Sequence, residues 1–462
     1  MWKSKVRYFL AWSSGPRLLA IYRRMYRLTI GMAVLMFRKC RGIRAAYLSR
    51  GCSKGEITPG ISDIDFVLIV NDDTRQRQRA ENVFRILQIL TAGLIPYHPA
   101  YVLTEEELHY RWRNTPYWRY RLQEGKSNWS LLHGREALSS LPVISDIERT
   151  TSCCAEMNYW WVQFCDFILQ NEKYRDDFVM RNSTCYKAVA EVLNARHALN
   201  TGEFCYSREE ALRRADSQLA RKLLDTAAKN FLGADRSLEQ ETYRFLIETF
   251  LDLWDGFRDD PFLEVYSDVV QEVDSADQDL QKEKLEEPFG EICRHLSDHW
   301  GGRCCVHLVK SAFWKIEDSL LLIDVDPASL PTLDDLDALI AVRKRVYNRQ
   351  RPAAYFFLRL GHVAFPITPA LPQDFHRGVL TPATAPDVFL QLGEKVVYWT
   401  KHTSWYLTDW LRNRQWPDAS PLKRSQLNMI ARSAAVGRVR YPLSRRSISE
   451  REITADEGHE NW

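Results

Sequence analysis

Two carboxylates stand two positions apart at the start of an apolar segment. Asp63 and Asp65 are followed by Phe66-Val-Leu-Ile-Val70, whose β-branched side chains predict a buried strand. Side chains two positions apart on a strand point to the same face, about 7 Å from each other. Such a pair can hold Mg²⁺ together with triphosphate oxygens, so the pattern indicates phosphoryl or nucleotidyl transfer. We therefore assign Asp63 and Asp65 as candidate metal ligands and catalytic residues.

A glycine-containing turn precedes these carboxylates. Residues 51–60 contain three glycines and one proline, which is typical of a loop with unusual backbone angles. A glycine here lets backbone N–H groups approach phosphate oxygens closely, and Arg50 adds positive charge beside it. The candidate residues for binding a nucleoside triphosphate are Gly51, Cys52, Lys54 and Ser62.

The neighbouring segments alternate between helical and strand patterns. Residues 17–40 have apolar side chains at helical spacing, and residues 44–49 are short and apolar enough for a buried strand. After the Asp63–Val70 strand, residues 74–92 predict an amphipathic helix and residues 100–103 another strand. This order predicts a mixed α/β module.

The run Leu48–Phe66 (LSRGCSKGEITPGISDIDF) resembles the signature of DNA polymerase β-like nucleotidyltransferases. The closest resemblance is to the aminoglycoside (streptomycin/spectinomycin type) adenylyltransferase group, and residues 188–203 are similar to the helical substrate domain of that group. The motif covers about residues 44–110, with a vaguer similarity to about 255. The resemblance implies Mg²⁺ as cofactor, a nucleoside triphosphate such as ATP as substrate, and a small-molecule hydroxyl as acceptor.

Two departures from the family pattern bear on activity. Cys52 stands where the family has Ser or Gly, and a thiol is a weaker hydrogen-bond donor. The later strand lacks the third carboxylate of the family, for which Glu105 and His98 are the nearby candidates. Two alternatives to a small-molecule acceptor therefore remain. One is transfer to a protein, an RNA or another nucleotide, and the other is a catalytically degenerate scaffold.

The chain as a whole predicts an α+β protein of several parts. A polymerase β-like core with a mixed sheet and helices is expected, followed by a helical domain and a further mostly helical region. The predicted segments are a basic N-terminal helical segment (1–29), a nucleotidyltransferase domain (30–140), a helical substrate-side domain (145–290), a mostly helical region (300–440) and a disordered tail (444–462).

Two weaker metal-binding patterns occur in the C-terminal half. Asp324-Val-Asp326 is a second Asp-x-Asp, which we interpret as the end of a helix leading into a turn. An irregular group of thiols and imidazoles could in principle bind zinc, but a polar helix end with buried thiols explains it better. This group consists of Cys293, His295, His299, Cys304 and Cys305.

Charge is distributed unevenly along the chain. Residues 1–50 contain twelve Lys or Arg and no acidic residue, although the net charge of the chain is only +3. The segment is either a solvated helix face or a contact for a polyanion or an anionic membrane surface. Within it, Leu28–Phe37 is too short to span a bilayer and predicts a core helix, with shallow interfacial binding as the alternative. Ten cysteines without a CxxC pair indicate reduced thiols and a cytoplasmic protein.

Overall fold

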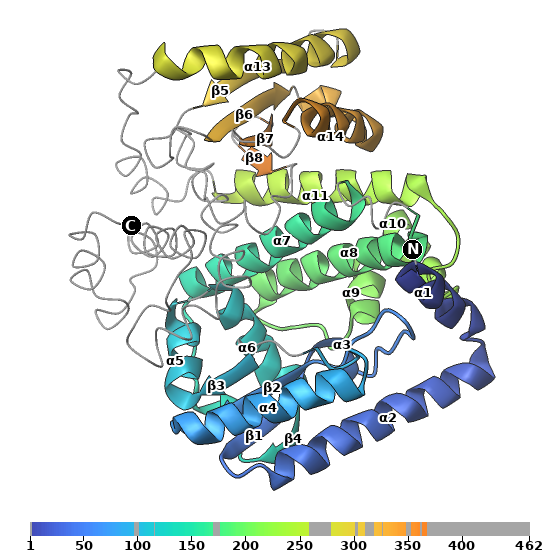
Figure 1. Cartoon of the computed structure of the whole chain (residues 1–462), viewed down its shortest axis with the longest axis vertical. Helices are drawn as coiled ribbons and strands as arrows, with labels where there is room; N and C mark the ends of the chain where they lie inside the picture. The colour runs from blue at the N-terminus through green and yellow to red at the C-terminus, as the bar shows by residue number, and fades with distance from the viewer. Residues whose placement is uncertain are drawn as a thin grey trace, which may run out of the picture.

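A small mixed sheet forms the centre of the N-terminal part of the protein (Figure 1). The structure is a computed structural model that describes residues 2–96, 101–114, 116–169, 176–257, 279–300, 304–309, 318–325, 327–347, 353–360 and 363–366. The sheet has the strand order β3-β2-β1-β4, with β1 antiparallel to β2 and β4, and β2 parallel to β3. Its strands are β1 (Ile43–Leu48), β2 (Phe66–Val70), β3 (Val102–Thr104) and β4 (Ser130–Gly134).

Strands β1, β2 and β3 are buried on both faces of the sheet, and their alternate residues enter different cores. Leu48 and Leu68 belong to the core beneath α2 (Pro16–Lys39) and α4 (Thr74–Leu90). Tyr47, on the opposite face, belongs to the large core shared with the following helices. A strand buried on both faces reads as a continuous apolar run, which is why Phe66–Val70 has no polar residue.

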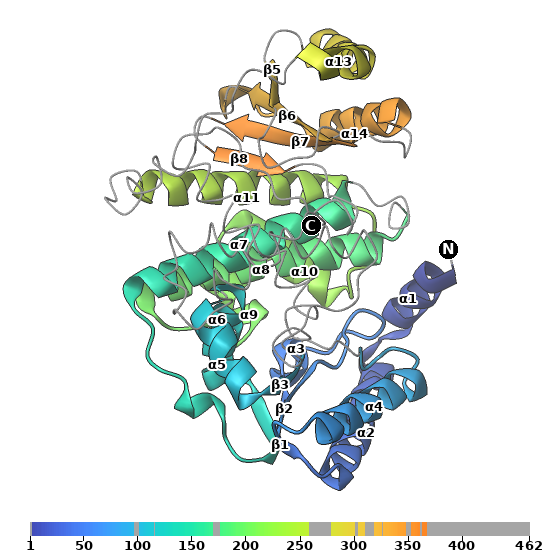
Figure 2. The same ribbon diagram turned by 60° about the vertical axis from the view of Figure 1, so that its left-hand side comes forward.

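A helical part follows the sheet (Figure 2). Two helices, α5 (Glu105–Asn114) and α6 (Pro116–Asn128), connect it to the sheet. Side-chain caps define the helix starts: Ser145 forms a capping box with Glu148 at α7, and Ser207 accepts from the Glu210 N–H at α9. The helices that follow are α7 (Asp146–Ile168), α8 (Phe178–Thr201), α9 (Arg208–Ala215), α10 (Gln218–Ala228) and α11 (Arg236–Phe257). The α+β class and the helices within residues 146–169 and 176–257 are as the sequence predicts.

A second four-stranded sheet lies beyond α11, so the prediction of a mostly helical region is wrong for the described residues between 304 and 366 (Figure 1). The apolar run Leu320–Ile323 fits a helix or a buried strand equally well by periodicity, and pairing with strands on both sides makes it a strand. Asp324 therefore lies in a strand and not at a helix end. The elements are α13 (Asp279–Trp300), β5 (Cys304–Val309), β6 (Asp318–Val325), η6 (Pro327–Ser329), α14 (Leu333–Tyr347), β7 (Ala353–Leu360) and β8 (Val363–Pro366).

Some expectations fall on residues outside these ranges. The predicted tail (444–462) and residues 367–440 of the predicted helical region are among them. None of the helices in the described ranges has the length and the apolar character needed to cross a bilayer.

Gly134 ends β4 in a place where no side chain fits. Its φ is +88°, and a Cβ at this position would lie 1.8 Å from the Arg44 carbonyl oxygen. We expect Gly134→Ala to lower the free energy of unfolding by about 3 kcal/mol or more, because backbone strain and a backbone clash add. Gly93→Ala is the control, since its φ is +86° with nothing within 4 Å, and it should cost only about 1 kcal/mol. If Gly134→Ala and Gly93→Ala shifted the urea midpoint equally, the backbone clash at Gly134 would not contribute to the loss of stability.

Candidate functional site

The ends of β1 and β2 bring the glycine turn and the two aspartates together. Leu48 pairs with Phe66, and the Ser49 N–H donates to the Asp65 carbonyl oxygen at 2.9 Å. The short helix α3 (Arg50–Ser53) begins directly after this contact. Residues that lie twelve or more positions apart in the sequence therefore meet at one end of the sheet.

The carboxylates of Asp63 and Asp65 accept no hydrogen bond from any residue in the described ranges. Asp63 is exposed, whereas the Asp65 side chain is only 13% exposed. The nearest cation to Asp65 is Arg50, whose Nε lies 3.8 Å from Oδ2, beyond hydrogen-bond distance. Burial raises the pKa of Asp65, and the Arg50 charge opposes this rise. A mostly buried carboxylate without a donor has free lone pairs that suit a metal ion.

Arg50 is held beside Asp65 by its backbone and by two phenols. Its φ of 57° is rare for a residue other than glycine. Its guanidinium donates to the Tyr101 hydroxyl at 2.8 Å and to the Tyr117 hydroxyl at 3.4 Å. Arg50 is therefore directed at the two tyrosines and only flanks the carboxylate.

Cys52 and Ser62 hold the turn together. The Cys52 thiol donates to the Asp63 carbonyl oxygen at 3.1 Å, and burial raises its pKa to about 12, so it stays protonated. Ser62 Oγ accepts from the Thr58 N–H at 2.9 Å and donates to the Glu56 carbonyl oxygen at 3.3 Å. The sequence predicts triphosphate contacts for both side chains, but in the structure their polar atoms bond the backbone of the loop.

Lys54 is also predicted to bind phosphate, but in the structure its ammonium contacts a glutamate. Its ammonium pairs with Glu124 Oε1 at 2.6 Å, and both side chains are almost fully buried. Burial lowers the pKa of Lys54, but the charges of Glu124 and Glu191 and the hydrogen bond to Glu124 together outweigh it, and the net shift is upward. Glu124 comes from α6, so the sequence near Lys54 gives no sign of this partner.

The sequence predicts that phosphate approaches the backbone of Gly51, but in the structure side-chain and backbone atoms of the protein lie close to it. A Cβ there would lie 3.1 Å from Arg208 Nη1 and 3.3 Å from the Glu56 carbonyl oxygen. The absence of a side chain at Gly51 thus lets α9 approach the turn. Packing against Arg208 and Glu56 therefore requires glycine at this position. The phosphate contact of Gly51 stays a prediction from the sequence.

Lys187 is a site residue that the sequence does not reveal. It lies half-buried on α8, and its ammonium has no ion pair or hydrogen bond within the part of the chain that the structure describes. Burial and the Arg208 charge lower its pKa, while the charges of Asp63 and Asp65 act in the opposite direction. An ammonium without a partner, within the electrostatic reach of Asp63 and Asp65, forms an arrangement that a metal–phosphate ligand would neutralise.

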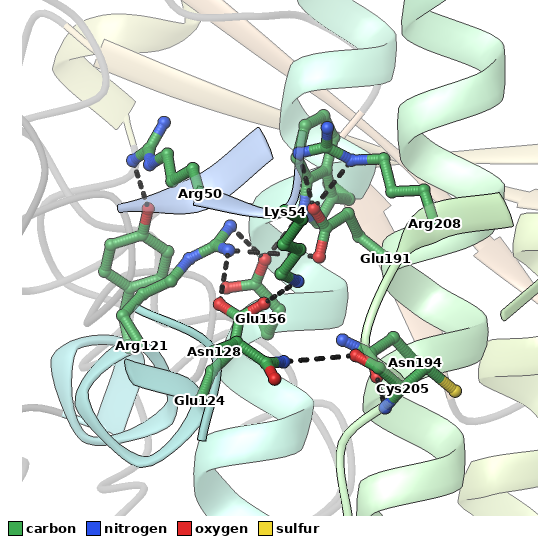
Figure 3. Close-up of polar contacts among 12 residues, drawn as sticks. Arg50, Lys54, Arg121, Glu124, Asn128, Glu156, Glu191, Asn194, Cys205 and Arg208 are labelled. Atoms are coloured by element: carbon green, nitrogen blue, oxygen red, sulfur yellow. Dashed lines mark hydrogen bonds and ion pairs between the residues drawn. The ribbon is translucent and has the colours of Figure 1, made fainter. Parts of the chain in front are cut away.

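A buried ionic network lies behind the turn and joins it to the helices (Figure 3). Arg208 on α9 reaches Glu191 Oε1 at 2.7 Å and Glu56 Oε2 at 2.9 Å. Arg121 on α6 pairs with Glu156 and reaches Glu124 Oε2 at 3.3 Å. These contacts link the loop after α3 to helices α6, α7, α8 and α9.

Two buried glutamates of this network, Glu191 and Glu156, have different charge environments. Glu191 has its pKa lowered to about 2, because the charges of Arg208, Arg121 and Lys54 outweigh its burial. Glu156 has its pKa raised to about 7, chiefly by burial, and its Oε2 is buried without a hydrogen-bond partner in the described structure. The network therefore holds a charged glutamate and, near neutral pH, one that is partly protonated.

We expect Glu156→Gln to change the pH dependence of stability. An acid with a raised native pKa stabilises the fold below its unfolded pKa of 4.5, and this stability is lost as pH rises through about 7. The glutamine keeps an acceptor for Arg121 and for the Trp160 indole, which donates at 2.6 Å. The variant should therefore be at least as stable as the wild type at pH 8 and relatively less stable at pH 5. If the difference in urea midpoint between the variant and the wild type were the same at pH 5 and pH 8, the raised pKa of Glu156 would be contradicted.

The third carboxylate of the family pattern is not found at this site. Glu105 pairs with Arg44 at 2.6 Å and follows Thr104, which lies beside Val70 at the far end of β2. Asp65 precedes the other end of β2, about 16 Å away along the strand. Glu105 therefore cannot join Asp63 and Asp65, and His98 is outside the described ranges.

No group of three or more His, Cys, Asp or Glu side chains within the described ranges is arranged to hold a metal ion. This bears on the zinc pattern near α13, where His295 and His299 stack with ring centroids 4.2 Å apart. At Asp63 and Asp65, two carboxylates suffice for Mg²⁺ only when substrate phosphates and water supply the remaining ligands.

Comparisons with known proteins give no match. Neither the family models, nor the curated proteins, nor the solved structures include one that matches this chain. Its function is therefore inferred from the site alone.

Proposed function

We propose that the protein is a Mg²⁺-dependent nucleotidyltransferase with its nucleotide site between the β1–β2 end of the first sheet and helix α8. The observation that carries this proposal is the pair of carboxylates, Asp63 and Asp65, that accept no hydrogen bond from the described residues. Their charges act on the ammonium of Lys187, which has no ion pair or hydrogen bond in the described structure. The transferred group would be a nucleoside monophosphate, and the acceptor a hydroxyl of a small molecule.

Asp63 and Asp65 would hold the metal. Their free lone pairs fit a hard cation that prefers oxygen ligands, and Mg²⁺ usually takes one or two carboxylates plus substrate phosphates. When bound, the metal would offset charge on the reacting phosphate and on the leaving pyrophosphate. The low exposure of Asp65 limits competition from water for this position.

Lys187 and Arg50 would bind phosphate oxygens. Lys187 offers an ammonium with no ion pair or hydrogen bond to a described protein group, and Arg50 lies beside Asp65 while donating to the Tyr101 hydroxyl. Binding a triphosphate would add negative charge near Lys187 and restore its pKa towards the ordinary value. The positioning of α8 relative to the turn would come from the Arg208 contacts to Glu191 and Glu56.

A nucleotide-binding protein without transferase activity is the second candidate. One observation favours it: Glu105 lies at the wrong end of the sheet, so no described acid is placed to accept the proton of an acceptor hydroxyl. Binding and transfer must therefore be measured separately. Transfer is tested by incubating protein with α-labelled triphosphate and candidate hydroxyl acceptors, and label that remains in nucleotide would favour this second candidate.

The test of the nucleotide site is isothermal titration of ATP, GTP, CTP and UTP in the presence of Mg²⁺. We expect micromolar binding of at least one of them, and a loss of at least about 100-fold in Asp63→Asn/Asp65→Asn. The control is Asp72→Asn/Asp225→Asn, which removes the same charge from exposed positions. Failure of the folded wild type to bind any triphosphate would overturn the proposal.

A further inference from the structure

Helices α1 (Trp2–Ser13) and α2 carry an unusual amount of exposed apolar surface. Of the fifteen large apolar side chains exposed in the described structure, nine lie on these two helices. Isolated exposed apolar residues are common, but a set gathered along one helix face marks an interaction surface. The nine residues, called here the apolar stripe, are Tyr8, Phe9, Trp12, Leu18, Ile21, Met25, Leu28, Met32 and Leu35.

The six residues on α2 lie along one side of the helix. They are spaced at alternating intervals of three and four positions from Leu18 to Leu35, which places them on one face. The opposite side of α2 contributes Tyr26, Ala33 and Phe37 to the core against the sheet. The sequence predicts a core helix for Leu28–Phe37, whereas the structure buries only one side of it.

The charged residues of α1 and α2 are all basic. Arg23, Arg24 and Arg27 are exposed on α2, and residues 1–50 contain no acidic side chain to neutralise them. Figures 1 and 2 show α2 on the outer side of the sheet, away from α11 and the second sheet. An exposed apolar face beside basic residues is typical of helices that lie in the interface of an anionic bilayer.

We propose that the apolar stripe and the adjacent arginines dock the protein on the surface of a membrane that contains anionic phospholipid. Self-association through the stripe would bring like-charged helices together, and nucleic acid would leave the apolar residues without a partner. Trp12 and Tyr8 add the aromatic side chains that favour the boundary between headgroups and acyl chains. The contact is peripheral, because neither helix is a candidate to cross the bilayer.

The docking surface is fixed to the rest of the molecule. Arg7 on α1 pairs with Asp177 at the start of α8, and its Nε donates to the Gly60 carbonyl oxygen at 3.0 Å. Ala11 packs with Val179 and Phe231. The proposal rests on these helices and not on the proposed nucleotide site, so either can fail without the other.

The experiment is flotation of the full-length protein with vesicles of phosphatidylcholine and phosphatidylserine, compared with vesicles of phosphatidylcholine alone. We expect binding to the anionic vesicles only, and at least about tenfold weaker binding for Ile21→Glu/Leu28→Glu. Arg24→Gln/Arg27→Gln should weaken it by a similar factor. The control is Val143→Glu/Tyr206→Glu, which changes two exposed apolar residues elsewhere and should bind as the wild type does.

Other results would overturn the proposal. One is absence of binding by the wild type, and another is equal binding by Ile21→Glu/Leu28→Glu in samples whose circular dichroism is unchanged. A dimer in analytical ultracentrifugation that dissociates in this variant, without vesicle binding by the wild type, would assign the stripe to a second copy of the chain. The proposal would be established if the wild type and the Val143→Glu/Tyr206→Glu control bound the anionic vesicles, while Ile21→Glu/Leu28→Glu and Arg24→Gln/Arg27→Gln did not.

Discussion

Replacing Lys187 by methionine should weaken the binding of a Mg²⁺–nucleoside triphosphate by about 10–100-fold. The ammonium has no other partner in the described structure, so the variant loses a charge-assisted contact to phosphate without disturbing an ion pair. Because burial lowers the pKa of Lys187, affinity should also fall as pH rises through that lowered pKa. Calorimetry across pH measures both effects.

Two variants serve as controls for Lys187. Lys187→Arg keeps the charge, titrates far above the range and should flatten the pH dependence of affinity. Lys229→Met removes an exposed lysine at the end of α10 and should bind triphosphate as the wild type does. If Lys187→Met bound triphosphate with unchanged affinity, α8 would not be part of the nucleotide site.

Replacing Glu191 by glutamine should lower the free energy of unfolding by about 3 kcal/mol at pH 7. A native pKa of about 2 against 4.5 in the unfolded chain corresponds to this difference, and breaking a buried ion pair costs a similar amount. For an acid with a lowered pKa the stabilisation is present above 4.5 and is lost as pH falls towards 2. The difference between wild type and variant should therefore shrink below about pH 4.5.

The control for Glu191 is Glu241→Gln on α11. Glu241 pairs with Lys222 at 2.5 Å, but both side chains are more than a third exposed, so its loss should cost less than about 1 kcal/mol. Urea midpoints of the two variants at pH 7 and pH 4 make the comparison. Equal small shifts at pH 7 would mean that the network around Arg208 does not stabilise the packing of α8 against the turn.

The local part of the site could be predicted from the sequence. The apolar run after Asp65 identifies a strand buried on both faces, and the turn at Gly51 identifies the loop that meets its start. These features depend on neighbouring residues and on the period of a strand, both of which the sequence contains. The order of strands and helices from β1 to β3 could be predicted, apart from the short helix α3. The sequence predicts a strand over Asp63–Val70, but β2 begins at Phe66, so both aspartates precede the strand and the same-face spacing of a strand does not apply to them.

The parts that could not be predicted depend on contacts between distant segments. Lys54 meets Glu124 seventy positions later, and Lys187 approaches Asp63 from a helix more than a hundred residues away. A lysine on a helix carries no local sign of such a partner. The second sheet could not be predicted because the run Leu320–Ile323 becomes a strand only through its neighbours.

The most direct test of the central claim is a crystal structure of the protein with Mn²⁺ and a triphosphate analogue that resists transfer. We predict an anomalous peak about 2 Å from carboxylate oxygens of both Asp63 and Asp65, with phosphate oxygens beside it and the Lys187 ammonium within hydrogen-bond distance of the triphosphate. A triphosphate bound elsewhere, or a bound nucleotide with neither aspartate in contact with the metal, would contradict the proposed site.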